Sequence, residues 1–184
     1  MQRKPKSEID QLTGRCLAAF VEAGSLDLSL DHLAAKVGIS KRMLIHYFGS
    51  RENLEEAAFA LLEERLRATF RAELFQPGIS LQAAVSALWD QTTAAHSRGT
   101  LLVVMDATRR AWSGSERAKA FYAEQQRLWI KLLANFLPDP AAVEELLQLF
   151  QGAILAYLVT GDRDMGKRAL ARMILKERAG ATPS

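Results

Sequence analysis

The sequence has few of the residues on which disulfide, metal-binding and secretory proteins depend. Its 184 residues include one cysteine, so no disulfide can form within the chain, which is typical of a reducing compartment. The three histidines, His32, His46 and His96, are far apart and have no cysteine partner, so we expect no metal site. No apolar run approaches the roughly 18 residues of a membrane span, and none follows the basic N-terminus as in a signal peptide. These features predict a cytoplasmic protein.

Motifs that carry catalysis are also missing. There is no glycine-rich phosphate loop, no G-x-S-x-G nucleophile motif and no paired-carboxylate pattern, so we expect neither an enzyme nor a cofactor. The net charge of +3 is too small to indicate nucleic-acid binding by itself. Because 49% of the residues are apolar and no alternating strand pattern appears, the sequence predicts an all-α fold with a substantial core.

One stretch is distinctive, and it reads SLDHLAAKVGISKRMLIHYF over Ser29–Phe48. Ser29 is a suitable N-cap for a first short helix, Gly38 ends that helix in a left-handed conformation, and Ser40 can cap a second one. No acidic residue lies between His32 and Arg51, although four basic residues fall in or at the end of this interval: Lys36, Lys41, Arg42 and Arg51. A short basic helix held across another helix is typical of a DNA-reading helix-turn-helix, although any two helices joined by a turn give a similar pattern.

The remainder of the N-terminal half predicts two more helices. The first runs from a cap at Ser7 to Ala23, after a basic arm over residues 1–6, and Cys16 lies on its apolar stripe as a small buried side chain. The second begins after Ser50 and reaches Phe75, where the sequence Gln-Pro-Gly breaks the chain. We expect its outer face to be solvated and of mixed charge: Glu55, Glu56, Glu63, Glu64, Arg65 and Arg67.

The C-terminal half also predicts helices throughout. Breaks are expected at residues 97–99, at Gly114 and at residues 137–140, where Asp139 is an N-cap and Pro140 the first helical residue. The helix over 140–160 is apolar nearly all round, which predicts burial on two sides, one of them against another subunit. Gly161 ends it, Asp162 or Asp164 begins a last helix, and the end GATPS is expected to be loose.

The helix-turn-helix stretch resembles the N-terminal domain of TetR-family transcriptional regulators. The family pattern is a Ser/Thr-capped helix, A-x-x-x-G-V-S, three variable residues, L-Y-x-H-F and x-S-K-x-x-L, and the chain has LAAKVGIS, KRM, LIHYF and GSRENL. Ile45 stands where the family usually has Tyr, and Tyr47 where it usually has His. In the family, this Tyr and this His commonly contact the DNA backbone. The resemblance therefore implies that His46 or Tyr47 makes the backbone contact in this chain. Arg51 replaces the usual Lys and keeps a phosphate-binding cation.

The resemblance implies an organisation and a function. It implies a DNA-binding domain over residues 1–50 with the helix-turn-helix at 29–48, a connecting helix over 51–76, and an effector-binding and dimerisation domain over 77–184. The expected protein is a homodimeric, ligand-responsive repressor. It would bind a palindromic operator in double-stranded DNA and be released by a small, partly apolar effector.

Site residues follow from the resemblance and the helix faces. The residues expected to contact DNA are Ser29, Ser40, Lys41, Arg42, Met43, His46, Tyr47 and Arg51, of which Lys41, Arg42 and Met43 face base edges. Those expected to line an effector pocket are Trp89, Thr92, His96, Met105, Arg109, Trp112, Tyr122 and Trp129. The dimer interface is expected to use Leu149, Gly152, Ala153, Ala156 and Tyr157.

Two alternatives stay open at this point. An aromatic stripe at helical spacing is usually plain core, so the chain could be a ligand-independent DNA-binding dimer. A protein of another class, a helical small-molecule-binding protein without specific DNA recognition, would also fit the helical pattern.

Overall fold

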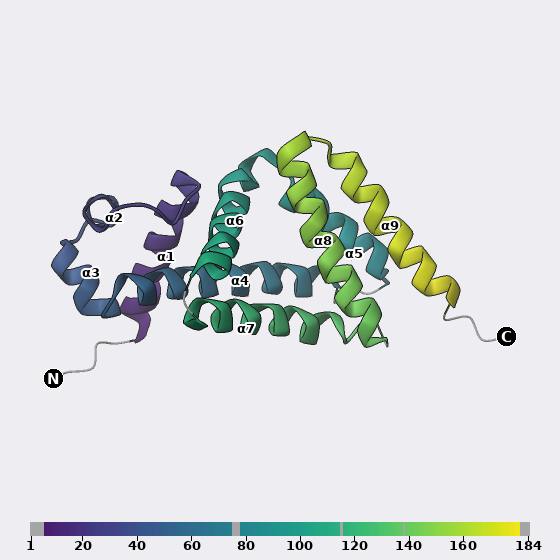
Figure 1. The fold of residues 1–184 in the computed structure, drawn as a ribbon, viewed down its shortest axis with the longest axis horizontal. Helices are drawn as coiled ribbons and strands as arrows, with labels where there is room; N and C mark the ends of the chain where they lie inside the picture. The colour runs from purple at the N-terminus through teal and green to yellow at the C-terminus, as the bar shows by residue number, and fades with distance from the viewer. Residues whose placement is uncertain (1–5, 75–77, 115, 138, 181–184) are drawn as a thin grey trace. The chain divides into compact units, whose positions relative to one another are not determined.

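A computed structural model shows the predicted all-α fold (Figure 1). The structure describes residues 6–74, 78–114, 116–137 and 139–180, and this part of the chain contains no strand. The helices are α1 Lys6–Ala23, α2 Leu30–Val37, α3 Lys41–Phe48, α4 Arg51–Leu74, α5 Leu81–Thr92, α6 Arg98–Ser113, α7 Glu116–Leu133, α8 Pro140–Thr160 and α9 Arg163–Gly180, with a 3₁₀ turn at Ala95–Ser97.

Capping residues fix several of these helix ends. The hydroxyl oxygens of Ser29, Ser40 and Ser80 accept hydrogen bonds from the first turns of α2, α3 and α5. Asp139 caps α8 and Gly161 ends it at φ 74°. Asp162 caps α9, since its carboxylate accepts from the backbone N–H groups of residues 164 and 165.

Some predicted boundaries are wrong by a few residues. Helix α1 begins at Lys6, one residue before the predicted cap position. Helix α6 begins at Arg98, because the break between the helices is the 3₁₀ turn at Ala95–Ser97. Helix α7 ends at Leu133, where the carbonyl groups of its last turn accept from Asn135. The basic arm, the break at 76–77 and the loose C-terminus lie largely outside the described residues.

The chain divides into two compact units. The first comprises Met1–Arg65 and Arg98–Ala123, and the second comprises Leu66–Ser97 and Glu124–Ser184. In the first unit α1 packs against both α2 and α6. In the second unit α9 packs against both α5 and α8, and Trp89 is completely buried with its ring edge-to-face on those of Phe150 and Tyr157. Helix α6 thus belongs to the compact unit that contains the helix-turn-helix.

The predicted solvated face of α4 is wrong at two positions. Glu55 and Glu63 are buried, with 9% and 7% of their surface exposed. Glu55 tolerates burial because Arg51 and Arg110 both pair with its carboxylate. The periodicity of a single helix could not reveal an arginine from α6.

No uninterrupted apolar run of membrane-spanning length occurs in helix α8, but the helix as a whole is strongly apolar. Its 21 residues reach a mean hydropathy of 1.4 in their most apolar window, so by length and composition they meet the criterion for a membrane-spanning helix. Core helices of globular proteins pass the same test. Parts of α8 are core here, since Val143 and Leu146 are buried, whereas Leu155 and Val159 are 56% and 79% exposed.

Candidate nucleic-acid interface

Helices α2 and α3 form a helix-turn-helix joined by the three residues Gly38–Ser40. Gly38 adopts φ 73°, a left-handed conformation that favours glycine, and its N–H bonds to carbonyl groups at the end of α2. The inner faces of the two helices are buried, through Leu33 and Val37 on α2 and Leu44 and Phe48 on α3. This packing fixes which face of α3 remains outside.

The outer face of α3 presents cations to solvent. Lys41, Arg42 and His46 are exposed, and Met43 is partly exposed beside them. The ammonium of Lys41 pairs with Asp31 at 3.0 Å, an exposed pair that a phosphate or base can replace at little cost. Arg42 has no hydrogen bond or ion pair among the described residues. An unengaged guanidinium on an exposed short helix suits bidentate recognition of guanine.

The remaining predicted DNA contacts surround α3. Ser29 and Ser40 use their hydroxyl oxygens as caps and lie on the surface. The hydroxyl of Tyr47 donates to Glu8 on α1, and its ring lies edge-on to that of His46. The carboxylate of Glu8 therefore lies close to the face that would approach phosphate.

Arg51 faces the protein interior more than the surface. Its guanidinium donates to the carboxylate of Glu55 at 2.6 Å and to the carbonyl oxygen of Leu26 at 2.8 Å. Its phosphate contact stays a prediction. Its observed role is to tie the start of α4 to the loop that precedes α2.

That loop is also held by α6. The backbone N–H of Leu26 donates to Asp106 at 2.8 Å, and Asp27 pairs with Arg109 at 3.1 Å and with Arg110. Burial acts to raise the pKa of Asp106, but hydrogen bonds from Leu26, Arg109 and Ser25 outweigh it and hold the pKa below its usual range. Sequence analysis missed this network, because its members are about 80 positions apart and no local motif connects them.

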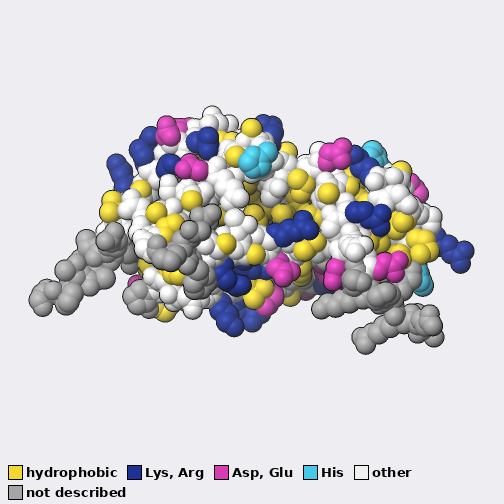
Figure 2. All heavy atoms as spheres, turned by 180° about the vertical axis from the view of Figure 1, so that it is seen from behind, with side chains coloured by type: hydrophobic (Ala, Val, Ile, Leu, Met, Phe, Trp, Pro, Cys, Tyr) yellow, Lys and Arg dark blue, Asp and Glu magenta, His cyan; other side chains and the backbone are white. Residues whose placement is uncertain are grey.

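Basic side chains do not form one large field among the described residues on the face drawn in Figure 2. Figure 2 shows Lys and Arg side chains interspersed with Asp and Glu over one face of the molecule. This distribution agrees with the net charge of only +3. The case for nucleic acid therefore depends on α3 and its surroundings.

The residues predicted to line an effector pocket are divided between the two compact units. Met105, Arg109, Trp112 and Tyr122 lie in the first unit and the other four, Trp89, Thr92, His96 and Trp129, in the second. Tyr122 lines a cavity of about 260 Å³, whereas Trp89 lines a separate one of about 100 Å³. The indole of Trp112 is 85% exposed, and Arg109 is engaged with acidic residues.

The predicted dimer residues on α8 differ in exposure. Gly152 is exposed, with no atom within 4 Å of the place a Cβ would occupy. Ala153 is buried within the chain, and the Tyr157 hydroxyl donates to the carbonyl of Thr93 at 3.0 Å. The most exposed large apolar residues of α8 are Leu155 and Val159. Neither is among the residues predicted to form the dimer interface.

These features define a helix-turn-helix protein with an all-α body. Residues 17–65 match the family model described as bacterial regulatory proteins, tetR family. Over these residues the chain is similar to TetR-family regulators.

Curated regulators are also similar to the chain in sequence. The chain is 27% identical over 134 residues to the HTH-type transcriptional regulator BetI of Escherichia coli O45:K1 (strain S88 / ExPEC), covering 70% of this chain and 66% of the relative. It thus spans about two thirds of the length of the curated relatives that it matches.

Solved structures share the fold over nearly the whole chain. A transcriptional regulator (RHA1_ro04179) from Rhodococcus sp. Rha1 superposes with a TM-score of 0.74 at 17% identity, covering 95% of this chain and 99% of that one. A member of the TetR family (SCO1917) from Streptomyces coelicolor A3 superposes with a TM-score of 0.73 at 19% identity. This match covers 92% of this chain and 98% of that one. The multidrug binding protein EbrR complexed with imidazole superposes with a TM-score of 0.72 at 19% identity. This match covers 92% of this chain and 96% of that one. All of these are named as regulators or binding proteins, none as an enzyme.

Proposed function

We propose that this protein is a homodimeric transcriptional repressor that binds a palindromic operator in double-stranded DNA through α3. The observation that carries the proposal is the capped α2–turn–α3 unit, whose exposed face presents Lys41 and an unengaged Arg42. Lys41, Arg42 and Met43 contact base edges, while Ser29, Ser40, His46, Tyr47 and Arg51 contact phosphates.

The dimer forms through α8 and α9. Four large apolar side chains of these helices are exposed, namely Leu155, Val159, Met165 and Leu175. Exposed apolar residues on two packed helices favour burial against the same face of a second copy, as expected for two-fold symmetry. A two-fold dimer reads half-sites about one helical turn of DNA (~34–36 Å) apart, or a multiple of it.

A small, partly apolar effector releases the operator, and the protein acts in the cytoplasm. EbrR, a structural relative, is described as a multidrug binding protein and has been solved with malachite green and with ethidium. An effector acts by binding one arrangement of the helix-turn-helix units more tightly than the other.

Selection of bound fragments from random duplex DNA tests the repressor function. We expect sequencing to recover a palindrome whose complex weakens steeply as salt increases, because phosphate contacts release counterions. Recovery of no motif at moderate salt would contradict the proposal. A ligand-independent regulator would give the palindrome but no effector in a screen for its release.

A further inference from the structure

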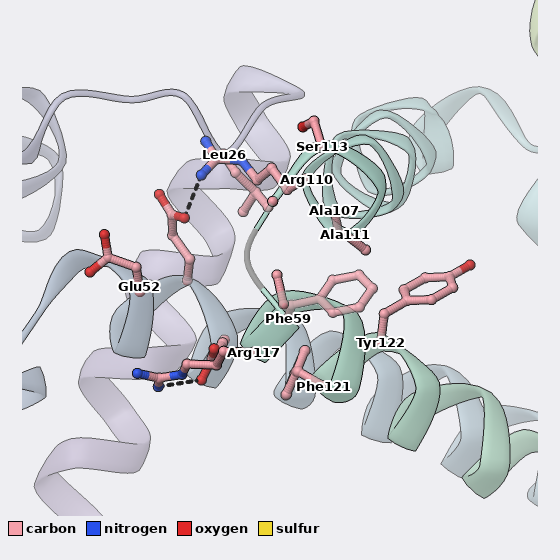
Figure 3. Close-up of a pocket in the computed structure, with 14 residues that line it drawn as sticks. Leu26, Glu52, Phe59, Ala107, Arg110, Ala111, Ser113, Arg117, Phe121 and Tyr122 are labelled. Carbon is pink, nitrogen blue, oxygen red and sulfur yellow. Dashed lines mark hydrogen bonds and ion pairs between the residues drawn. The ribbon is translucent and has the colours of Figure 1, made fainter.

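The first compact unit contains a cavity of about 260 Å³ (Figure 3). It lies between the first turns of α4, the second half of α6 and the start of α7, and Leu26 from the loop before α2 reaches it. Phe59, Phe121 and Tyr122 supply aromatic walls, and the rings of Phe59 and Phe121 are 6.1 Å apart. Small ligand pockets in proteins have this mixture of apolar walls and a few polar groups.

The charged groups of the cavity do not balance. The lining contains three glutamates, Glu52, Glu55 and Glu56. It contains only two arginines, Arg110 and Arg117. Arg110 pairs with Glu55 and Arg117 with Glu56 at 2.7 Å, as the dashed lines in Figure 3 show. Glu52 has no ion-pair partner within the described part of the chain. The lining therefore carries an excess of one negative charge.

The environment of Glu55 disfavours its negative charge. Burial raises the pKa of Glu55 above its usual range, even though Arg110 and Arg51 act to lower it. Arg110 is shared, because its guanidinium also pairs with Asp27. The negative charge of Glu55 is thus incompletely stabilised by the protein, and a further cation nearby would stabilise it.

We propose that this cavity binds a small organic cation with an apolar or aromatic portion. The excess negative charge favours a cation and disfavours an anion, and the aromatic rings of Phe59, Phe121 and Tyr122 attract cations through their faces. The small volume favours a compact ligand over an extended one. The proposal concerns binding alone; its effect on DNA rests on the repressor function proposed above.

The cavity is connected to the loop that precedes the helix-turn-helix. Glu55 holds Arg51, which donates to the Leu26 carbonyl, and Arg110 bridges Glu55 and Asp27. A ligand cation beside Glu55 competes with these two arginines for its carboxylate. Binding therefore loosens the loop that positions α2, and operator affinity falls.

Isothermal titration calorimetry of the full chain with benzyltrimethylammonium tests the binding. Benzyl alcohol is the neutral control and benzoate the anionic one. We expect benzyl alcohol to bind about tenfold more weakly than the cation, and benzoate not to bind measurably. Equal or tighter binding of either control compound would overturn the proposal.

Two variants locate the site. Glu52→Gln removes an exposed charge of the lining and should weaken cation binding about two- to fivefold, whereas Glu64→Gln, on the exposed face of α4 outside the cavity, should not. Ala107→Leu places a larger side chain in the cavity and should abolish binding, with thermal unfolding confirming that the variant is folded. Unchanged cation binding in either lining variant would overturn the assignment.

The effect of the cation on operator binding is measured in a separate experiment. With an operator in hand, saturating benzyltrimethylammonium should lower the operator affinity of the parent chain but not of Ala107→Leu. A chain that binds the cation but no duplex DNA would refute the repressor function and leave the cavity assignment standing. Cation binding with no change in operator affinity would overturn the connection through Glu55 and Arg110.

Discussion

Gly99 of α6 lies directly against the carbonyl group of Val21 in α1. A Cβ on Gly99 would be 2.0 Å from that carbonyl oxygen and 3.0 Å from its carbon, so the two backbones are in van der Waals contact. This close approach helps to fix α6 against the helix that supports α2 and α3.

Gly99→Ala should therefore destabilise the protein. No side chain can move to relieve a contact with backbone, so α6 must shift, and we expect a loss of about 2–3 kcal/mol in the free energy of unfolding. Gly14→Ala is the matched control. Its Cβ would meet the end of the Arg65 side chain at an ordinary 3.5 Å, and its position inside α1 predicts a gain of about 0.5–1 kcal/mol. Urea unfolding curves measure both, and equal stability of the two variants would contradict the contact.

Asp106→Asn should weaken the hold of α6 on the loop before α2. Oδ2 of Asp106 accepts from Leu26 N and from the Ser25 hydroxyl at 3.1 Å, and Oδ1 accepts from Arg109. An amide cannot accept at both positions, so we expect a loss of about 1–2 kcal/mol at neutral pH.

The pH dependence of this loss provides its test. Since the folded protein lowers the pKa of Asp106, its stabilisation is complete above the ordinary value of 3.8 and is lost as the pH falls through the lower folded value. The stability difference between the parent and Asp106→Asn should therefore shrink as the pH falls below 3.8. A difference that stays constant with pH would show that shape, and not charge, is responsible.

Arg42→Ala should cost about 1–3 kcal/mol in operator binding and relax specificity at one base pair. The guanidinium is exposed and unengaged, so its removal should leave the fold unchanged. Arg71→Ala, which removes an exposed arginine near the end of α4, is the control for loss of charge. Fluorescence anisotropy with the selected operator and single-base variants measures both effects. Wild-type affinity in Arg42→Ala would show that other residues read the bases.

Cys16 should make the protein sensitive to alkaline pH. It is completely buried, and burial raises its pKa from 9.0 to about 11, with the Arg15 charge acting weakly in the opposite direction. The unfolded chain therefore loses this proton first, and stability falls as the pH rises from 9.0 towards the folded value, by up to about 2–3 kcal/mol. Cys16→Ala should unfold with a shallower pH slope in this range. Parallel slopes for the two proteins would contradict the burial of the thiol.

Val159→Glu should convert the proposed dimer to a monomer. The side chain is 79% exposed in the single chain, so the substitution should not disturb folding, but it would bury a charge in the dimer. Trp112→Glu, which alters an equally exposed apolar residue of the other compact unit, is the control. Sedimentation velocity distinguishes the species. Retention of the dimer in Val159→Glu would place the interface elsewhere.

The sequence predicts local structure well where one short segment contains the whole cause. The caps Ser29, Ser40 and Asp139 and the left-handed Gly38 are confirmed, because a cap depends on residues within one turn. The exposed basic face of α3 follows from the same local pattern, since Leu44 and Phe48 fix the buried side.

Contacts between distant segments could not be predicted in this way. Glu55 was expected on a solvated face because its partner Arg110 lies 55 positions away, and the cavity beside them draws its lining from three helices. Helical periodicity states which face of a helix is apolar but not which charged residue of another helix will meet it.

The sequence alone thus determined the all-α class, the helix-turn-helix and the cationic face of α3, because these depend on short-range periodicity and capping. Only the tertiary structure decided that α6 packs on α1, that Glu55 is buried, and that Asp106 and Arg110 hold the loop before α2. Those features arise from packing and charge pairing between segments about 50 to 80 residues apart, which no local pattern encodes.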